Sequence, residues 1–211
     1  MVFYREMLWP VIAYLYAYTI GFSVMDKSVF TKYTSTFNGF LCIITVWHEN
    51  IFNYRNFHAV GSHELIQTLY RFAAYLFVDG LFMLLNQKKI NKETVTFLLH
   101  HAVGGLGIFL MAYLRIGLGL GLYFAATEFS TLFLNLWKIR KSAVYFKIFA
   151  LTFFLSRIVT LPLLWVYIYE NNGLISMEHW SLQLMAYGGC GTLSLLNVIW
   201  FIGILLKLRS N

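Results

Sequence analysis

The chain alternates long apolar runs with short polar connections from one end to the other. Each run has roughly the 20 residues that an α-helix needs to cross the hydrocarbon of a bilayer. We therefore predict an all-α membrane protein of about seven transmembrane helices. The predicted spans cover roughly residues 7–24, 35–53, 64–86, 93–113, 116–136, 144–169 and 182–206.

Composition places the chain in the same class. Hydrophobic residues make up 59% of the chain and charged residues 12%, whereas about a quarter of an ordinary soluble domain is charged. With 211 residues, the predicted spans leave no room for a second soluble domain. We expect one domain, in which residues 1–34 form an N-terminal span with its connection and residues 35–211 form the main transmembrane unit. Cys42 and Cys190 fall in apolar runs and predict buried thiols, not a disulfide framework.

The distribution of Lys and Arg predicts the orientation. Three of these residues fall on the same side as the N-terminus and eleven on the other, while Arg71 and Arg157 fall inside predicted spans. Positive charge concentrates on cytosolic loops, so we expect a luminal or outside N-terminus and a cytosolic C-terminus. The net charge of +7 is then mainly a topology signal, and no nucleic-acid partner is predicted.

Two adjacent imidazoles, His100 and His101, lie inside the fourth apolar run. An ionisable side chain at such depth is costly, which makes the pair a functional-site hypothesis. On a helix, Gly104 and Gly105 lie one turn further along on the same faces. The space that these glycines leave suits either a lipid chain or a closely packed neighbouring helix.

Polar residues from four predicted helices fall at one depth, about 10–15 Å from the cytosolic end. They are Asp79, His100, Glu128 and Asn197. On the fifth helix, i+3 and i+4 spacing places Thr131 and Asn135 on the same face as Glu128. A carboxylate can hold an imidazole tautomer and stabilise its cation, leaving the ring to move a proton or accept an acyl group. This constellation predicts a site for a charged or activated lipid, open toward the cytosol.

Structural roles for the same residues remain open. Asp79 and Glu128 could serve only to neutralise Arg71 or Arg157 in buried ion pairs. His48, near the luminal end of its span, is better explained by contact with water.

Metal and haem chemistry fit the pattern less well. Adjacent histidines cannot both face one haem. A di-iron centre would need several histidine clusters of short spacing, and the sequence has one such cluster. We therefore predict no metal and no tightly bound cofactor.

A stripe of small residues, Gly117, Gly121 and Ala125, suits close helix packing. It would serve equally well within one protomer or between the protomers of a homodimer.

An ordered set of short motifs resembles a known family. The set consists of Trp47-His48, Tyr75-Leu76-Phe77-Val78-Asp79, His100-His101, Glu128-Phe129-Ser130-Thr131 with Phe133 and Asn135, Phe153-Phe154-Leu155-Ser156-Arg157 with Pro162, and Asn197 with Trp200-Phe201. In this order the motifs are similar to those of the TLC-domain proteins, a membrane family that includes the ceramide synthases. The resemblance runs from about the second span to the end of the chain.

The resemblance implies a barrel-like bundle of helices around a lipid-accessible cavity with the paired histidines inside. In the ceramide synthases that pair is tied to acyl transfer from acyl-CoA to the amine of a sphingoid base. Carried over by position, His100 and His101 would be acyl acceptor and general base, and Glu128 would replace an Asp. Acyl-CoA would be the co-substrate, long-chain bases and fatty acyl chains the lipid partners, and the endoplasmic reticulum the location. Together with the residue patterns, this gives a catalytic set of His100, His101, Glu128 and Asp79, and a cavity lined by His48, Tyr75, Gly104, Thr131, Asn135, Arg157 and Asn197.

The chain also departs from the ceramide synthases. Thr127 and Thr131 stand where those enzymes have a further His and a second acid. The Glu-Phe-Ser-Thr run is more similar to smaller TLC-domain proteins, which are linked to ceramide formation and to phospholipid composition. Two functions therefore remain open: acyl transfer of the ceramide synthase type, and non-catalytic lipid binding or sensing that regulates membrane lipid composition through a partner enzyme.

Overall fold

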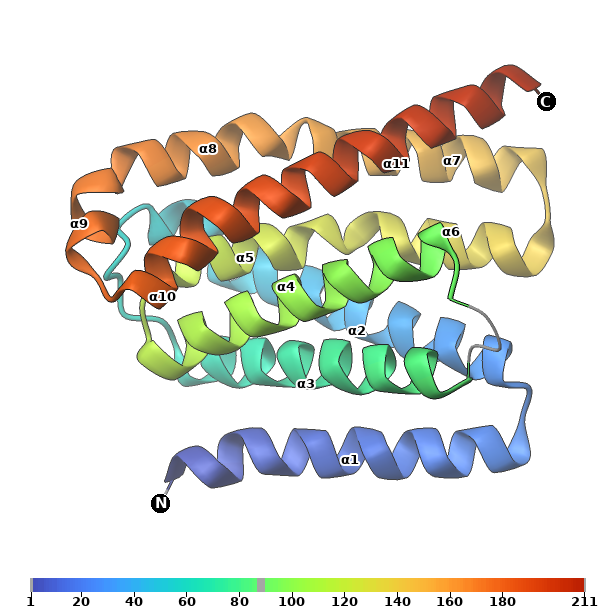
Figure 1. Ribbon diagram of the computed structural model, residues 1–211, viewed down its shortest axis with the longest axis horizontal. Coiled ribbons are helices and arrows are strands. Elements are labelled where there is room, and N and C mark those ends of the chain that lie inside the picture. The colour runs from blue at the N-terminus through green and yellow to red at the C-terminus, as the bar shows by residue number, and fades with distance from the viewer. Residues whose placement is uncertain (1, 87–89, 211) are drawn as a thin grey trace.

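The computed structural model describes residues 2–86 and 90–210, and this part of the chain folds into helices without strands (Figure 1). The first four long helices are α1 (Val2–Val24), α2 (Lys27–Glu49), α3 (His63–Asn86) and α4 (Lys92–Leu114), with the 3₁₀ turn η1 (Ile51–Tyr54) after α2. They are followed by α5 (Leu118–Thr127), α6 (Phe129–Arg140), α7 (Ala143–Phe153), the π-helical η2 (Phe154–Ile158), α8 (Thr160–Glu170), α9 (Asn172–Met177), α10 (Trp180–Gln183), the π-helical η3 (Leu184–Gly189) and α11 (Cys190–Ser210). The two termini lie at opposite ends of the bundle (Figure 1).

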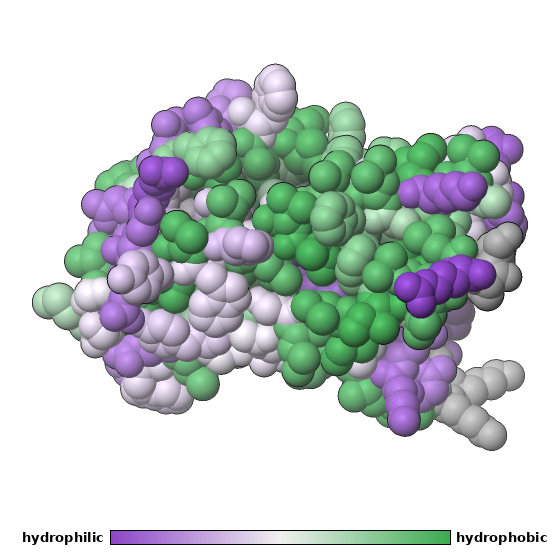
Figure 2. Space-filling model, turned by 90° about the horizontal axis from the view of Figure 1, so that it is seen from above, coloured by the Kyte–Doolittle hydropathy of each residue, from purple (hydrophilic) through white to green (hydrophobic). Residues whose placement is uncertain are grey.

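The chain is an all-α integral membrane protein, as predicted. Within the described residues, four helical segments are long and apolar enough to cross a membrane: His63–Asn86, Lys92–Leu114, Ala143–Glu170 and Trp180–Arg209, with Leu8–Val24 as a shorter apolar helix. A helix break at Glu128 divides the fifth predicted span into α5 and α6, of 10 and 12 residues. The total of seven crossings therefore stays a prediction. Apolar residues cover the middle of one face of the molecule, and polar residues gather toward its ends (Figure 2).

The second helix begins eight residues earlier than its apolar run suggested. The carboxylate of Asp26 accepts hydrogen bonds from the backbone N–H groups of Ser28 and Val29 at 2.8 and 3.1 Å, which satisfies the free donors of the first turn. The first turns of α2 are therefore helical although most of their residues are polar, because Asp26 caps the helix. The helix ends at Glu49 because the next residue, Asn50, has a positive φ of 50°.

Close packing of α3 against α4 forms the centre of the bundle. A Cβ atom at Gly104 would lie 3.5 Å from the side chain of Leu76, and one at Gly105 would lie 3.1 Å from the ring of Phe77. Of the two explanations for these glycines, the closely packed neighbouring helix is correct, because side chains of α3 fill the space above the histidines.

The small-residue stripe also packs within the protomer. Gly117 is not helical: it precedes α5 with a φ of 68°, and its N–H donates to the carbonyl of Phe57 at 2.6 Å. A Cβ at Gly121 would lie 3.1 Å from Leu69 of α3.

Among the glycines, Gly119 on α5 lies closest to the backbone of another segment. A Cβ there would lie 2.4 Å from the carbonyl oxygen of Tyr54 and 2.6 Å from the ring of Tyr167. We predict that Gly119→Ala destabilises the purified protein by about 1–3 kcal/mol, the usual cost of overpacking, seen as a lower melting temperature in detergent. Gly191→Ala is the matched control, since in the described part of the chain its added Cβ would meet no atom of another segment within 4 Å. Equal melting temperatures for both variants would contradict the prediction.

Candidate functional site

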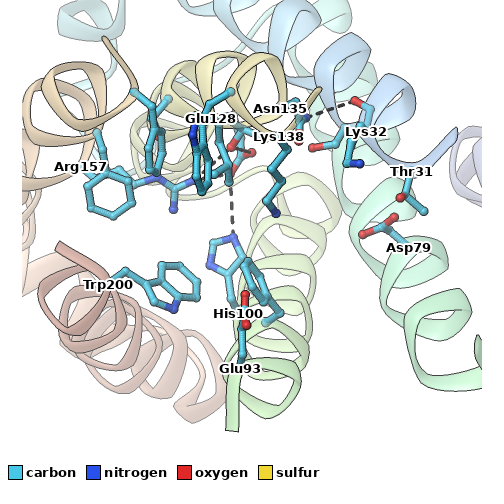
Figure 3. Close-up of a pocket in the computed structure, with 18 of the residues that line it drawn as sticks. Thr31, Lys32, Asp79, Glu93, His100, Glu128, Asn135, Lys138, Arg157 and Trp200 are labelled. Carbon is cyan, nitrogen blue, oxygen red and sulfur yellow. Dashed lines mark hydrogen bonds and ion pairs between the residues drawn. The ribbon is translucent and has the colours of Figure 1, made fainter. Parts of the chain in front are cut away.

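A cavity of about 530 Å³ lies between α2, α3, α4, α6, α7 and α11. It extends from the interior toward the end of the bundle where Lys32, Lys138 and Lys207 line it. Its volume is in the range of sites for small ligands. Charged groups and aromatic rings share its walls (Figure 3).

His100 forms the first of two histidine–carboxylate pairs in this cavity. Its Nε2 atom lies 3.9 Å from Oε1 of Glu128, and both side chains are largely buried. Figure 3 shows the imidazole directed at the carboxylate across the cavity, with Trp200 beside it. The Trp200 ring meets the imidazole edge to face, with centroids 5.4 Å apart. Glu128 can therefore stabilise a positive charge on the imidazole, and the indole limits the orientations of the ring.

Arg157 holds Glu128 in place. Its Nη2 atom lies 3.2 Å from Oε1 of Glu128, its Nε atom donates to Ser130 at 3.0 Å, and its Nη1 atom donates to Asn197 at 3.2 Å. The second carboxylate oxygen accepts from the hydroxyl of Thr131 at 2.9 Å. The buried charge of Glu128 is thus fully compensated, as a buried carboxylate requires.

A π-helical segment brings Arg157 to this position. The segment η2 follows α7, and directly after it the N–H of Val159 donates to the carbonyl of Phe154, five residues earlier, at 2.9 Å. Pro162 has no N–H to offer the carbonyl of Ile158, and its ring would clash with that carbonyl in a regular α-helix. The wider turn relieves this conflict just before the proline, and π-turns of this kind are frequent at functional sites.

His101 forms the second pair with Asp79. The Nδ1 atom of His101 lies 3.6 Å from Oδ2 of Asp79, which is too long for a hydrogen bond. This nitrogen is buried and has no hydrogen-bond partner among the residues that the structure describes. The other oxygen of Asp79 accepts a short hydrogen bond from the hydroxyl of Tyr18 on α1. Gly80 packs beside His101, because a Cβ there would lie in ordinary contact with the Cβ of His101, at 3.4 Å.

The structure brings most of the predicted site residues together. Those that line the cavity are His100, His101, Glu128, Asp79, Tyr75, Thr131, Asn135 and Arg157. His48, Gly104 and Asn197 do not line it. Asn197 instead anchors Arg157 from α11, and Gly104 packs against Leu76.

His48 lies at the other end of the bundle. Its side chain is 79% exposed and lies 3.8 Å from Glu49. The placement of His48 in the cavity was therefore wrong, and the structural interpretation of this residue is the better one. The reason is that α2 ends at Glu49, so His48 sits in the last turn of the helix, far from the depth of the paired histidines.

The two candidate arginine pairs have different outcomes. Arg157 pairs with Glu128, as the structural interpretation proposed. Arg71 is exposed and donates to Gln67 at 3.1 Å on its own helix, so it does not neutralise Asp79.

Sequence reasoning missed Tyr18, Gly80 and Lys138. Lys138 extends into the cavity between His100 and Asp79 (Figure 3) and lies 5.8 Å from the centre of the Phe97 ring. The spacing of Tyr14 and Tyr18, four residues apart in an apolar helix, was a signal that one helix face offers two hydroxyl groups to a neighbour. No sequence signal distinguished Gly80.

Two of the eleven basic residues assigned to the cytosolic side, Lys88 and Lys89, lie outside the described residues.

Over residues 2–86 and 90–210, no group of three or more His, Cys, Asp or Glu side chains is arranged to hold a metal ion.

These observations define a class of protein: an integral membrane helical bundle whose interior holds a polar cavity with two histidine–carboxylate pairs. A family model described as the TLC domain matches residues 5–206, almost the whole chain and including α1. The chain belongs to the TLC-domain family. This membership indicates a function that is related to membrane lipids. Comparisons with curated proteins and with solved structures gave no match.

The Glu128–Arg157 pair yields a stability prediction. Glu128→Gln leaves the buried guanidinium without a counter-charge, which costs about 3–5 kcal/mol when one partner of a buried pair is removed. We expect a strongly lowered melting temperature in detergent, with part of the loss recovered in the double variant Glu128→Gln/Arg157→Gln. Glu93→Gln, at an exposed position on the rim of the cavity, serves as the control. A double variant no more stable than Glu128→Gln would contradict the interpretation.

Proposed function

We propose that the protein is a lipid acyltransferase of the ceramide synthase type, which transfers an acyl group from acyl-CoA to a long-chain amine. The observation that supports this most is the presence of two histidine–carboxylate pairs on the walls of one cavity. Membership of the TLC-domain family supports a lipid substrate. Apolar and aromatic side chains on the same walls suit hydrocarbon chains.

The proposed reaction has two steps. In the first, the imidazole of His100 attacks the thioester carbonyl, the carbon–sulfur bond breaks, and the thiol leaves with the proton that the imidazole gives up. In the second, the amine nitrogen of the lipid attacks the acyl-imidazole, the bond between the acyl carbon and the His100 nitrogen breaks as the amide forms, and His101 transfers the proton released from the amine to the departing His100 ring. The net reaction converts a thioester and an amine to an amide and a thiol.

The carboxylates have separate roles in this scheme. Glu128 stabilises positive charge on His100 and is itself held by Arg157. Asp79, which faces Nδ1 of His101, stabilises the positive charge that the ring acquires when it takes up a proton. Each histidine therefore has a carboxylate beside it, and His100 shares its carboxylate with Arg157.

Acyl transfer can be tested with purified protein, radiolabelled acyl-CoA and a long-chain base. We expect His100→Ala and His101→Ala each to lower amide formation by about 10²-fold or more, the contribution of a positioned acid–base group. His48→Ala is the matched control, because this histidine is exposed and outside the cavity. Its activity should equal that of the wild type. Equal amounts of amide from the wild type and both cavity variants would contradict the proposal.

A second candidate is non-catalytic lipid binding or sensing that regulates membrane lipid composition. The Glu128–Arg157 pair favours it, because an ion pair of this kind stabilises a bundle without any chemistry. In that case lipid mass spectrometry would find a lipid that co-purifies with both the wild type and His100→Ala, and no variant would show turnover.

For the orientation, we propose a luminal N-terminus and a cytosolic C-terminus in the endoplasmic reticulum. Lys32, Lys138 and Lys207 line the cavity at the same end of the bundle as the C-terminus, and positive charge favours the cytosolic side. In sealed microsomes we expect added protease to digest a C-terminal epitope tag and to leave an N-terminal tag intact. The opposite pattern would reverse the proposed orientation and place the cavity mouth in the lumen.

A further inference from the structure

Tyr18 is an unusual residue in α1 because its phenol is completely buried. Its hydroxyl donates a short hydrogen bond to Oδ1 of Asp79 and lies 3.0 Å from the hydroxyl of Thr34. The rings of Phe30 and Phe82 enclose it, with centroids 5.2 and 4.9 Å away. A buried tyrosine retains its hydroxyl at low cost only where that hydroxyl has a partner, and here the partner is a carboxylate on the cavity wall.

Because of this hydrogen bond, the two carboxylate oxygens of Asp79 have different neighbours. Oδ1 is taken by Tyr18, and Oδ2 faces the Nδ1 atom of His101 at 3.6 Å. Within residues 2–86 and 90–210, no group forms a hydrogen bond with that buried nitrogen. A proton on Nδ1 would therefore point at Oδ2, and contacts of this kind often tighten when a ligand fills the site.

We propose that Tyr18 is a positioning residue for the paired-histidine site. By holding Oδ1, it keeps Oδ2 directed at His101 and thereby favours the tautomer with the proton on Nδ1. The Nε2 atom of His101 is then the nitrogen that takes up a proton in the cavity. The consequence for acyl transfer rests on the proposed function, whereas the effect on the tautomer does not.

Tyr14 provides a matched comparison. It lies one turn before Tyr18 on α1, and its hydroxyl donates a short hydrogen bond to Asn38 of α2. It does not line the cavity. Both tyrosines hold α1 against the bundle by a hydrogen bond from the hydroxyl, but only Tyr18 bonds to a carboxylate of the site. Tyr14→Phe therefore controls for the loss of a docking hydrogen bond.

The tautomer of His101 can be read from ¹⁵N NMR spectra of the full-length protein labelled on histidine, with His101→Gln used to assign the signal. In the wild type we expect the Nδ1-protonated form. In Tyr18→Phe we expect a shift toward the Nε2-protonated form, while Tyr14→Phe keeps the wild-type spectrum and the His100 signals stay unchanged in both. Asp79→Asn should reproduce the shift and serves as the second variant should Tyr18→Phe not fold.

Turnover gives an independent readout. Under the acyl-transfer proposal, Tyr18→Phe should lower kcat by about tenfold or more with little change in KM, since the residue acts through the proton-transfer step. A changed tautomer without turnover in any variant would support the positioning role and reject acyl transfer. A wild-type tautomer in folded Tyr18→Phe would overturn the positioning role whatever the turnover, and so would a wild-type tautomer in Asp79→Asn.

Discussion

A charge inside an apolar bundle must find its counter-charge within the protein, and Arg157 is where this constraint acts most strongly. Its guanidinium binds Glu128, Ser130 and Asn197, and so ties η2 to the start of α6 and to α11. Glu128 cannot turn away without leaving Arg157 unpaired, which would cost several kcal/mol. The direction of Glu128, and with it the environment of His100, therefore follows from an ion pair that also stabilises the fold.

The adjacency of the histidines gives them different surroundings. Successive residues of a helix point about 100° apart, so the His100 ring meets Glu128 and Trp200, while that of His101 meets Asp79. Two carboxylates, one on α3 and one between α5 and α6, thus face two different rings in one cavity. α1, at the edge of the bundle, participates through Tyr18.

The irregular parts of the helices coincide with polar positions. Glu128 stands where α5 ends and α6 begins, and Arg157 stands in a π-helical segment before a proline. In both places the ordinary i→i−4 bonding is interrupted. An interrupted helix can direct a side chain where a regular one would not, and here the two interruptions coincide with the residues that form the ion pair, Glu128 and Arg157.

The pattern of apolar runs was sufficient to predict the membrane class and the approximate helix ranges, because hydrocarbon tolerates only backbone that bonds to itself. The motifs sufficed for the TLC-domain family. Counting residues along each helix, whose rise is constant, placed Asp79, His100 and Glu128 at one level, and all three line the cavity. Only the tertiary structure decided the partners of the charged groups. Glu128 pairs with Arg157, Arg71 is exposed and bonds to its own helix, and Asp79 accepts a hydrogen bond from Tyr18. Rotation of each helix about its axis and the breaks at Glu128 and η2 set these contacts, and both depend on packing between segments far apart in the chain.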